Sequence, residues 1–227
     1  FDSKSRTWKL KEGVVDSSPL SDTPRPGNAK FKKLTPVDPN STNPYQLTEA
    51  DRTVIGNTTP KFSGGFGLNA TYKGFDMSMF FNFMYDFDVL NANKIMLTTW
   101  ADNKENNFLM DIASDKRWRN FDDMGNEIRY SPEVLAEFNK NATMWNPTSI
   151  GRPICMSYAV EDGSFLRLNS ATLGYTLPSV WTKKVGLSKV RFYVSGNNLF
   201  TLTGYSGYDP EVNIATGLTP NIDRSEE

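Results

Sequence analysis

The longest regular alternation of hydrophobic and polar positions covers residues 62–88 and predicts two β-strands around a tight turn at Lys73-Gly74. In residues 62–72 the even positions are mostly apolar and the odd positions are small or polar, which is the period of two of a strand with two different faces. The next strand continues the pattern, and its odd positions are all apolar or aromatic: Phe75, Met77, Met79, Phe81, Phe83, Tyr85 and Phe87. One face of this hairpin is therefore apolar along its whole length.

The length of these two strands changes the interpretation of the pattern. Each runs to roughly 11 residues or more, whereas strands of soluble domains usually have about 5 or 6. About 9 to 11 tilted residues cross a bilayer, so length and alternation together predict a transmembrane barrel hairpin. The alternative is a long hairpin of a soluble β-sandwich, with the Phe/Met face packed on a second sheet.

A second hairpin of the same design follows in residues 164–200. Ala171, Leu173 and Tyr175 alternate with small or polar residues until Pro178, and the alternation resumes after a short connector at residues 179–188. Both hairpins have a short turn at one end and a long connection at the other. This asymmetry is typical of bacterial outer-membrane barrels.

The chain divides into five regions on this basis. Residues 1–60 are rich in Pro, Asn, Asp, Ser and Thr and predict loops, with candidate short strands at residues 7–10 and 29–32. A barrel hairpin at residues 61–88 is followed by a long insertion at 89–163, the second hairpin at 164–200 and a loop at 201–227. Because the strong pattern begins only after about sixty polar residues, we expect the chain to start in the middle of a longer protein.

The insertion is far longer than most connections, so we expect it to carry structure of its own. Residues 89–100 are compatible with a helix, and a second helix is predicted after Ser131, an N-cap residue followed by Pro132. Trp100, Trp118 and Trp145 lie in this region, together with the basic run at residues 116–119. These tryptophans either pack a small core of the insertion or line a ligand cavity or partner interface, where Trp and Arg are favoured.

Composition excludes much of the usual catalytic chemistry. The chain has 25 basic and 26 acidic residues, no histidine and one cysteine, Cys155. The overall charge balance gives no reason to expect nucleic acid or an anionic membrane surface as a partner. An internal disulfide, a Cys/His zinc site and a His-based triad cannot be built. The acidic residues between positions 38 and 51 lack the spacing of an EF-hand.

We therefore expect no catalytic residues, no metal and no cofactor. Paired carboxylates such as Asp122-Asp123 or Glu161-Asp162 are compatible with a glycosidase, but adjacent loop acids are more often simply solvated. No apolar run approaches the about 18 residues of a membrane-spanning helix. Strands escape that exclusion, since only alternate residues of a barrel strand face lipid.

Several blocks of the sequence resemble a known family. Residues 161–178 read EDGSFLRLNSATLGYTLP, residues 190–200 read VRFYVSGNNLF, and residues 207–212 read GYDPEV. Upstream, residues 51–57 read DRTVIGN and are followed by Pro60-Lys61-Phe62 and Gly64-Gly65. In this order the blocks resemble the C-terminal part of the SusC/RagA family, which are TonB-dependent transporters of the outer membrane of Bacteroidetes.

The resemblance implies an all-β fold, namely late strands of a large, plugged, antiparallel membrane β-barrel of about 22 strands with short helices in long extracellular loops. It implies import of oligosaccharides or peptides beneath a SusD-like surface lipoprotein, driven by the TonB complex acting through an N-terminal part. The short turns would face the periplasm. A glycine- and aspartate-rich turn that the family usually carries before Asp51-Arg52 is absent, and so is the usual closing strand, which leads us to expect further chain beyond residue 227.

The resemblance also directs attention to the loops as the region that contacts cargo or partner. The candidate contact residues are Trp100, Arg117, Trp118, Trp145 and Tyr208. A soluble carbohydrate-binding β-sandwich, with the Trp-rich insertion as its binding face, is the alternative function.

Overall fold

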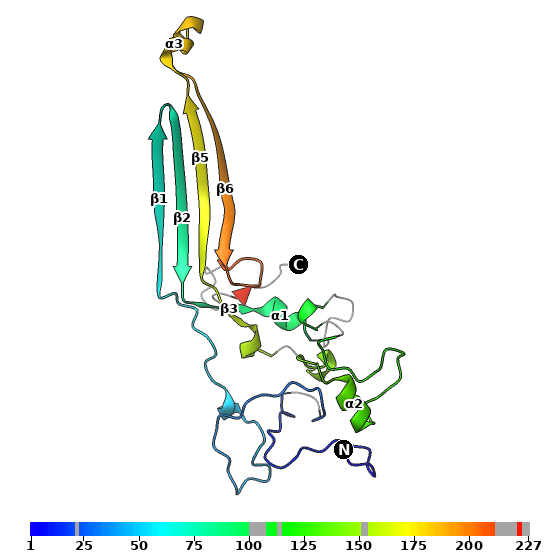
Figure 1. Cartoon of the computed structure of the whole chain (residues 1–227). Coiled ribbons are helices and arrows are strands. Elements are labelled where there is room, and N and C mark those ends of the chain that lie inside the picture. The colour runs from blue at the N-terminus through cyan, green and yellow to red at the C-terminus, as the bar shows by residue number, and fades with distance from the viewer. Residues whose placement is uncertain (21–22, 100–107, 113–114, 151–153, 212–221, 224–227) are drawn as a thin grey trace. The chain divides into compact units, whose positions relative to one another are not determined.

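The computed structural model describes residues 1–20, 23–99, 108–112, 115–150, 154–211 and 222–223. Contacts divide the chain into two compact units, which Figure 1 shows in ribbon form. The loop unit consists of Phe1–Val54 and Ala92–Ala159, and the sheet unit consists of Ile55–Asn91 and Val160–Glu227.

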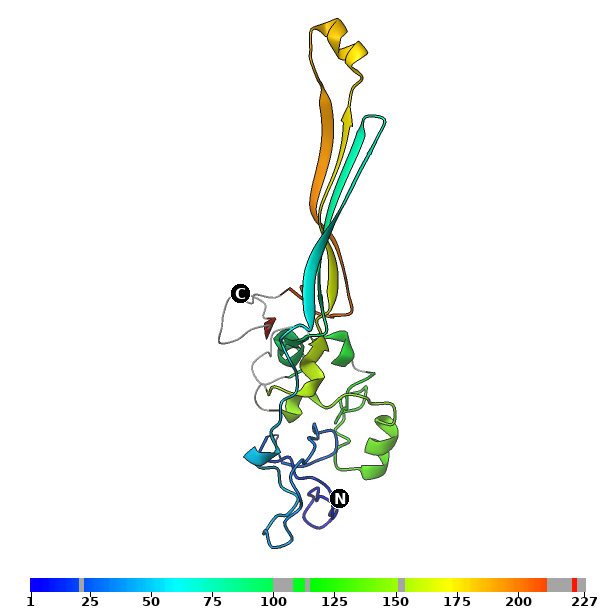
Figure 2. The ribbon, with the colours of Figure 1, turned by 90° about the vertical axis from the view of Figure 1, so that its left-hand side faces the viewer.

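The sheet unit contains a four-stranded antiparallel sheet with the strand order β1-β2-β5-β6 (Figure 1). Its strands are β1 (Phe62–Tyr72), β2 (Phe75–Tyr85), β5 (Phe165–Thr176) and β6 (Arg191–Thr203). Both predicted hairpins are confirmed, and β2 pairs with β5, so that the two hairpins form one continuous sheet. Figure 2 shows the twist of the sheet along its length. Among the described residues the sheet is open, with β1 and β6 as its edges.

The two hairpins turn by different means. Lys73 and Gly74 both have positive φ, 46° and 87°, which is the type I′ geometry whose twist matches that of paired strands. The connector between β5 and β6 contains two short helices, α3 (Ser179–Thr182) and η5 (Lys183–Val185), and Gly186 closes η5 at a φ of 74°. Glycine suits this position because a left-handed backbone carries no steric cost there.

A β-bulge keeps the two sides of the sheet distinct. Phe80 and Phe81 of β2 are consecutive, but their partners in β5 are separated by the extra residue Asn169. One extra residue reverses the alternation of all side chains beyond it. Leu168 therefore lies on the same side of the sheet as Ala171, although one has an even and the other an odd number.

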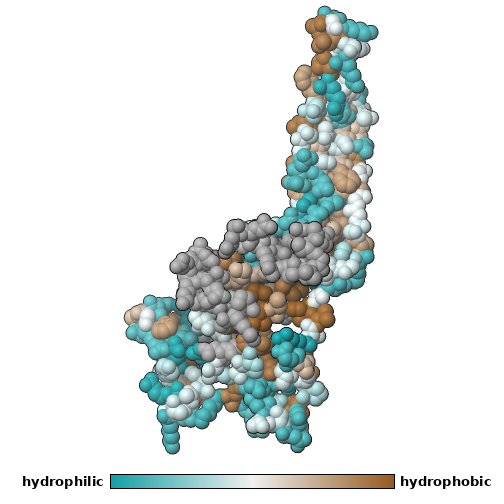
Figure 3. All heavy atoms as spheres, turned by 180° about the vertical axis from the view of Figure 1, so that it is seen from behind, coloured by the Kyte–Doolittle hydropathy of each residue, from teal (hydrophilic) through white to brown (hydrophobic). Residues whose placement is uncertain are grey.

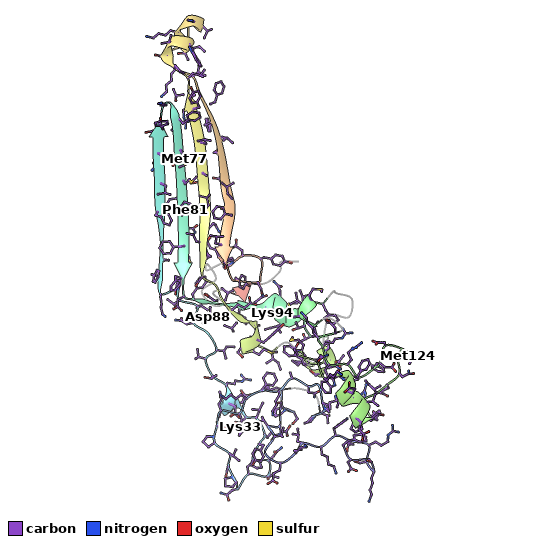
Figure 4. The ribbon with its side chains drawn as sticks, viewed as in Figure 1. Lys33, Met77, Phe81, Asp88, Lys94 and Met124 are labelled. Carbon is purple, nitrogen blue, oxygen red and sulfur yellow. The ribbon has the colours of Figure 1, made fainter. Side chains whose placement is uncertain are left out.

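The register gathers the apolar positions of all four strands on one side of the sheet. This apolar face consists of Phe62, Gly64, Phe66, Leu68, Ala70, Tyr72, Phe75, Met77, Met79, Phe81, Phe83, Tyr85, Leu166, Leu168, Ala171, Leu173, Tyr175, Phe192, Val194, Gly196, Phe200 and Leu202. Met77 and Phe81 mark it along β2 in Figure 4. The opposite side, the polar face, is mostly Ser, Thr, Asn and Gly with a few charged and aromatic side chains.

The buried core of the sheet unit lies at one end of the strands. Phe87, Val89, Phe165 and Tyr205 form a buried cluster, and Met84 packs against it. A small second sheet has the strand order β4-β3-β7. Its strands are β4 (Val160–Asp162), which precedes β5, β3 (Asp88–Asn91), which follows β2, and β7 (Ile222–Asp223). No residue from the middle of the four long strands belongs to this buried cluster.

The loop unit has little regular structure. Its elements are η1 (Glu49–Asp51), α1 (Ala92–Met96), η2 (Met110–Ile112), α2 (Pro132–Phe138), η3 (Pro147–Ser149) and η4 (Ser157–Ala159). Its interior is aliphatic, with Ile112, Leu135 and Ile150 each no more than 2% exposed. The helix predicted after Ser131 is confirmed as α2, which begins at Pro132. None of the helices in the described ranges has the length and apolar content to span a bilayer.

Three local predictions are wrong. Residues 88–91 form strand β3 rather than the start of a helix, because Val89 is fully buried and its backbone pairs with β4. In the described part of that prediction, residues 89–99, the helix covers residues 92–96. The candidate strand at residues 7–10 is reduced to an isolated bridge between Thr7 and Asp2, and residues 29–32 form no strand.

Candidate functional site

The apolar face has the dimensions of a bilayer core. Ten residue steps separate Phe75 from Tyr85 on β2, which at about 3.4 Å per residue and a tilt of about 35 to 45° corresponds to a height of about 24 to 28 Å. Aromatic rings concentrate at both ends, with Phe75 and Tyr175 4.5 Å apart at one end and Phe62 and Tyr85 stacked at 4.9 Å at the other. Barrel walls carry an apolar band about 25 Å tall between two aromatic girdles.

An ion pair crosses three strands of the polar face. Arg191 of β6 binds Asp76 of β2 through two bonds, Nε to Oδ1 at 3.0 Å and Nη2 to Oδ2 at 2.5 Å. Gly174 of β5 lies between them, and an added Cβ there would come within 2.5 Å of the guanidinium and 2.7 Å of the carboxylate. The glycine thus makes room for a bidentate bond that links β2 directly to β6.

Arg167 holds the segment after β6 against the polar face. Its side chain is 12% exposed, forms ion pairs with Asp209 and with Glu211 at 2.9 Å, and donates to Thr201 Oγ1 at 3.1 Å. Residues 204–211 are therefore tied to β5 rather than extended away from it. Tyr205 in the same segment is buried in the cluster at the end of the strands.

An exposed aromatic ring on the mostly polar side lies against glycines of β1. Phe80 remains 45% exposed, and its ring would lie 2.8 Å from a Cβ built on Gly65 of β1. Gly65 and its neighbour on this face, Gly67, leave β1 without side chains beneath that ring. The glycines predicted only as small residues of a strand thus provide space for a ring from the adjacent strand.

The loop unit brings three of the five predicted contact residues together. Arg117 forms a parallel bridge with Met144, and the backbone N–H of Trp118 donates to the Met144 carbonyl at 2.9 Å, next to Trp145. The Trp118 indole packs against Gly27, where an added Cβ would lie 2.1 Å from the ring. Trp118 and Trp145 are both half-buried, and neither indole N–H has a hydrogen-bond partner in the described part of the chain.

Trp145 belongs to a row of aromatic and cationic groups. Its ring meets that of Tyr158 edge-on at 4.9 Å, and Lys94 Nζ lies 4.5 Å from the centre of the Tyr158 ring. The Tyr158 hydroxyl donates to Asp111 at 3.4 Å. Lys94 is labelled in Figure 4. The row combines ring faces and charged groups, the combination that stacks on flat or apolar parts of a ligand while holding its polar groups.

The remaining two predicted contact residues are placed differently. Tyr208 lies in the sheet unit, in the segment held by Arg167, and is 84% exposed. Trp100 lies outside the described residues.

Asp51 shows how the acidic residues of the N-terminal loops are used. Its carboxylate accepts hydrogen bonds from Thr35 N and Oγ1, both at 2.7 Å, and lies 3.2 Å from Lys33 Nζ, labelled in Figure 4. The Thr35 bonds, followed by those from Thr48 and Leu34, hold the pKa of Asp51 well below its usual range. Protein donors thus surround both oxygens, and no cluster of three potential metal ligands occurs within the described ranges.

Sequence reasoning missed the charged residues of the polar face. The sequence analysis assigns no role to Asp76, Arg167 or Arg191, although the neighbours of each in sequence are apolar on both sides. A charged residue at a polar position of a long alternating strand is the sequence feature that could have indicated such an ion pair. The sequence does not show which residue is the partner, because Asp76 and Arg191 are 115 residues apart.

Known proteins similar to this chain are receptors and importers. The chain is 36% identical over 202 residues to TonB-dependent receptor P3 of Formosa agariphila, covering 89% of the chain and 17% of that protein. TonB-dependent receptor P26 of the same organism is 26% identical, covering 90% of the chain and 18% of that protein. The chain therefore spans less than a fifth of the length of these relatives. No protein-family model matches it.

Solved structures with the same fold include two states of one complex. The RagAB peptide importer in its closed-closed state aligns with a TM-score of 0.56 and 22% identity, over 79% of this chain and 17% of that chain. The open-open state aligns with a TM-score of 0.53 and 22% identity, over 95% of this chain and 23% of that chain.

The continuous apolar face with aromatic ends, together with this fold match, defines the sheet as wall of an antiparallel transmembrane β-barrel. The sequence similarity places it in the class of TonB-dependent receptors. The chain therefore belongs to the TonB-dependent receptors, the wider class to which the SusC/RagA resemblance of its sequence blocks points, and it shares the fold of the RagAB structures.

Proposed function

We propose that this chain forms part of the wall and outer loops of a transporter that imports oligosaccharides or peptides across the outer membrane. The polar face lines the lumen, and the loop unit contacts cargo or a SusD-like surface lipoprotein. Energy would come from the TonB complex acting through an N-terminal part of the protein. This segment needs no cofactor and carries out no covalent chemistry.

The single observation that carries the proposal is the uncovered apolar face. Phe66, Leu68 and Leu173 lie in its central part and are 44 to 51% exposed. A monomeric soluble protein rarely leaves so large an apolar surface in water, whereas lipid makes it favourable. The alternative of a soluble carbohydrate-binding β-sandwich requires this face to be packed on a second sheet. Its exposed state supports the transporter.

The orientation follows from the connections. The turn at Lys73-Gly74 and the α3–η5 connector are the short ones, and short turns lie on the periplasmic side of bacterial barrels. The loop unit and the segment after β6 would then face the outside. Cargo selection would take place there, because binding residues concentrate on loops held by a rigid scaffold.

Two features support a cargo-contacting role for the loop unit. The backbone of Trp118 pairs with Met144, the residue before Trp145, and a row of aromatic and cationic groups continues from Trp145 through Tyr158 to Lys94. Rings of this kind stack on sugar faces and on apolar side chains of peptides. The name of the solved relative, a peptide importer, favours peptides of the two cargo classes.

Uptake by cells that display the full encoded protein tests this proposal. We expect Trp145→Ala to weaken uptake of peptide or oligosaccharide mixtures, with Trp118→Ala giving a weaker loss because its ring also packs on Gly27. Trp181→Ala, a tryptophan of α3 at the other end of the sheet unit, serves as the matched control. Surface display and lipoprotein pairing are measured in parallel. Unchanged uptake and pairing in both loop variants would remove these residues from the contact site.

A further inference from the structure

We propose that the connector between β5 and β6 docks on anionic phospholipid head groups at the membrane surface. This connector, residues 177–190, is called the tip below. The inference rests on the proposed function, because it requires the sheet to stand in a membrane. It concerns the opposite end of the strands from the loops that would meet cargo.

The tip is strongly cationic. It contains Lys183, Lys184 and Lys189, and none of its 14 residues is acidic. All three lysines are exposed. Lys73 adds a further positive charge at the neighbouring hairpin turn, and Asp76, the acidic residue nearest to that turn in sequence, is taken up by its bidentate bond to Arg191. The tip therefore carries a net positive charge that favours a partner with negative charge.

The tip also exposes large apolar side chains. Val180 is 67% exposed, Trp181 59%, Val185 71% and Leu187 50%. Apolar side chains scattered singly on a surface need no explanation, but four of them within eight residues form a patch that water does not favour. Trp beside Lys is the combination found where a protein meets the head-group level of a bilayer.

The backbone of the tip is fixed, so this exposure is a property of the fold. Leu187 N–H donates to the Thr182 carbonyl at 3.0 Å, Gly186 N–H to the Lys183 carbonyl at 3.2 Å, and Leu177 N–H to the Val190 carbonyl at 2.9 Å. Thr182 is 1% exposed, so its side chain is buried within the tip. A turn with this many internal bonds presents the same outer groups whether or not a partner is present.

The exposed groups of the tip continue the apolar face. At this end of the sheet the apolar face ends in Phe192 and Val194 of β6, which are 64% and 68% exposed. Figure 1 shows α3 beyond the ends of β5 and β6, and Figure 3 shows hydrophobic and hydrophilic residues mixed at that end. A surface that extends a lipid-facing wall and adds lysines fits the head-group layer. A soluble protein partner would have no reason to follow the wall.

A fluorescent probe on the tip tests this in the full encoded protein. The dye NBD is attached at exposed Ser188 as Ser188→Cys, after Cys155 and every other cysteine of the full protein have been changed to Ser. The protein is placed in nanodiscs of phosphatidylcholine or of an equimolar mixture with phosphatidylglycerol. In separate samples, either the phosphatidylcholine or the phosphatidylglycerol is brominated, and the brominated lipid quenches a probe that lies at the membrane surface.

We expect brominated phosphatidylglycerol to quench at lower mole fraction than brominated phosphatidylcholine. A lysine near an anionic surface contributes about 1 kcal/mol, so each Lys→Gln change among Lys183, Lys184 and Lys189 should weaken the preference for phosphatidylglycerol by roughly fivefold. Trp181→Ala should lower quenching by both lipids. The matched control replaces three exposed lysines of the loop unit, Lys4, Lys32 and Lys116, and should leave the preference unchanged.

The outcomes separate this inference from the proposed function. A protein that enters nanodiscs while its probe stays accessible to aqueous iodide, or is quenched equally by both lipids, overturns only the role of the tip. If the loop-unit control loses as much of the preference for phosphatidylglycerol as the tip variants do, the role of the tip is also overturned, because the preference would then depend on overall charge. A protein that fails to enter nanodiscs overturns both. If one of the single Lys→Gln variants does not insert, the other two single variants of the tip carry the test.

Discussion

The sheet unit and the loop unit order their residues in opposite ways. In the sheet unit, order comes from backbone pairing in register, and all eleven residues of the edge strand β1 are exposed. In the loop unit, strands are absent from the described part, and order comes from aliphatic burial and from polar side chains that tie distant segments. Asn139, for example, accepts from Arg119 N–H at 2.7 Å and donates to the carbonyls of Arg119 and Leu135 at 2.9 Å.

This difference explains how one chain serves two environments. The sheet leaves its apolar face uncovered and depends on its surroundings to make that face favourable. The loop unit buries aliphatic side chains of its own, among them Ile112, Leu135 and Ile150. A wall that depends on the membrane is constrained at every second position, whereas a self-contained loop region can change its surface while keeping its core.

The largest expected effect comes from placing a charge on the apolar face of the sheet. Phe81 lies on the apolar face between the aromatic ends and stacks on Phe66 at 4.9 Å. Phe81→Lys should destabilise the inserted state by about 2 to 4 kcal/mol, as lysine near the bilayer midplane does in barrels. Folding titrations into lipid vesicles measure this. Ser78→Lys, on the polar face of the same strand, is the control. Equal losses in the two variants would show that this side of the sheet does not face lipid.

The second prediction concerns the polar side of the same sheet. Gly174→Ala places a Cβ against Asp76 and Arg191, at 2.5 to 2.7 Å from their charged groups. The atoms it meets are the ends of flexible, partly exposed side chains, so the ion pair between β2 and β6 should be displaced at a cost of up to about 1 kcal/mol. Denaturant unfolding in lipid measures the loss. Gly67→Ala on β1 is the control, since its added Cβ meets nothing closer than 3.6 Å. A larger loss in the control would contradict the packing described for Gly174.

The smallest effect is a pH dependence confined to the loop unit. Because hydrogen bonds from Thr35 lower the folded pKa of Asp51, its stabilising contribution is fully present above the unfolded value of about 3.9 and is lost as pH falls below it. Limited proteolysis of the N-terminal loops should show falling protection below about pH 4. Asp51→Asn should reduce protection at neutral pH and flatten this change. Glu49→Gln, an exposed neighbour, is the control and should behave like the unaltered protein.

Much of the sheet could be predicted because its information is local. Period two, strand length and the Lys73-Gly74 turn fix both hairpins without knowledge of any partner strand. The bulge at Asn169 could not be predicted in this way, since it becomes visible only when β5 is aligned with β2. The helix expected at residues 89–100 failed at its start for a related reason. Val89 pairs with β4 and is buried in a cluster whose members come from distant segments.

The candidate site was less predictable than the wall. The sequence identifies the tryptophans by residue type. Their placement depends on the pairing of residues 117–118 with residue 144, and neither segment has a sequence pattern that predicts this pairing. The block at residues 207–212 contributed to the family resemblance, yet its physical role emerges only from Arg167, which binds Asp209 and Glu211. Loop conformation depends on which distant groups satisfy each other, and residue types alone leave many such pairings open.

The sequence by itself determined that residues 62–88 form a hairpin with one apolar face, that a second hairpin shares its design, and that the chain belongs among the TonB-dependent receptors. Those conclusions rest on side-chain alternation, which the backbone geometry of a strand converts directly into two faces. Only the tertiary structure decided that β2 and β5 join the hairpins, that a bulge keeps their apolar sides aligned, and that Gly174 makes room for an ion pair across three strands. The physical reason is that these features depend on contacts between residues far apart in the chain, whose register is set by pairing and packing rather than by local pattern.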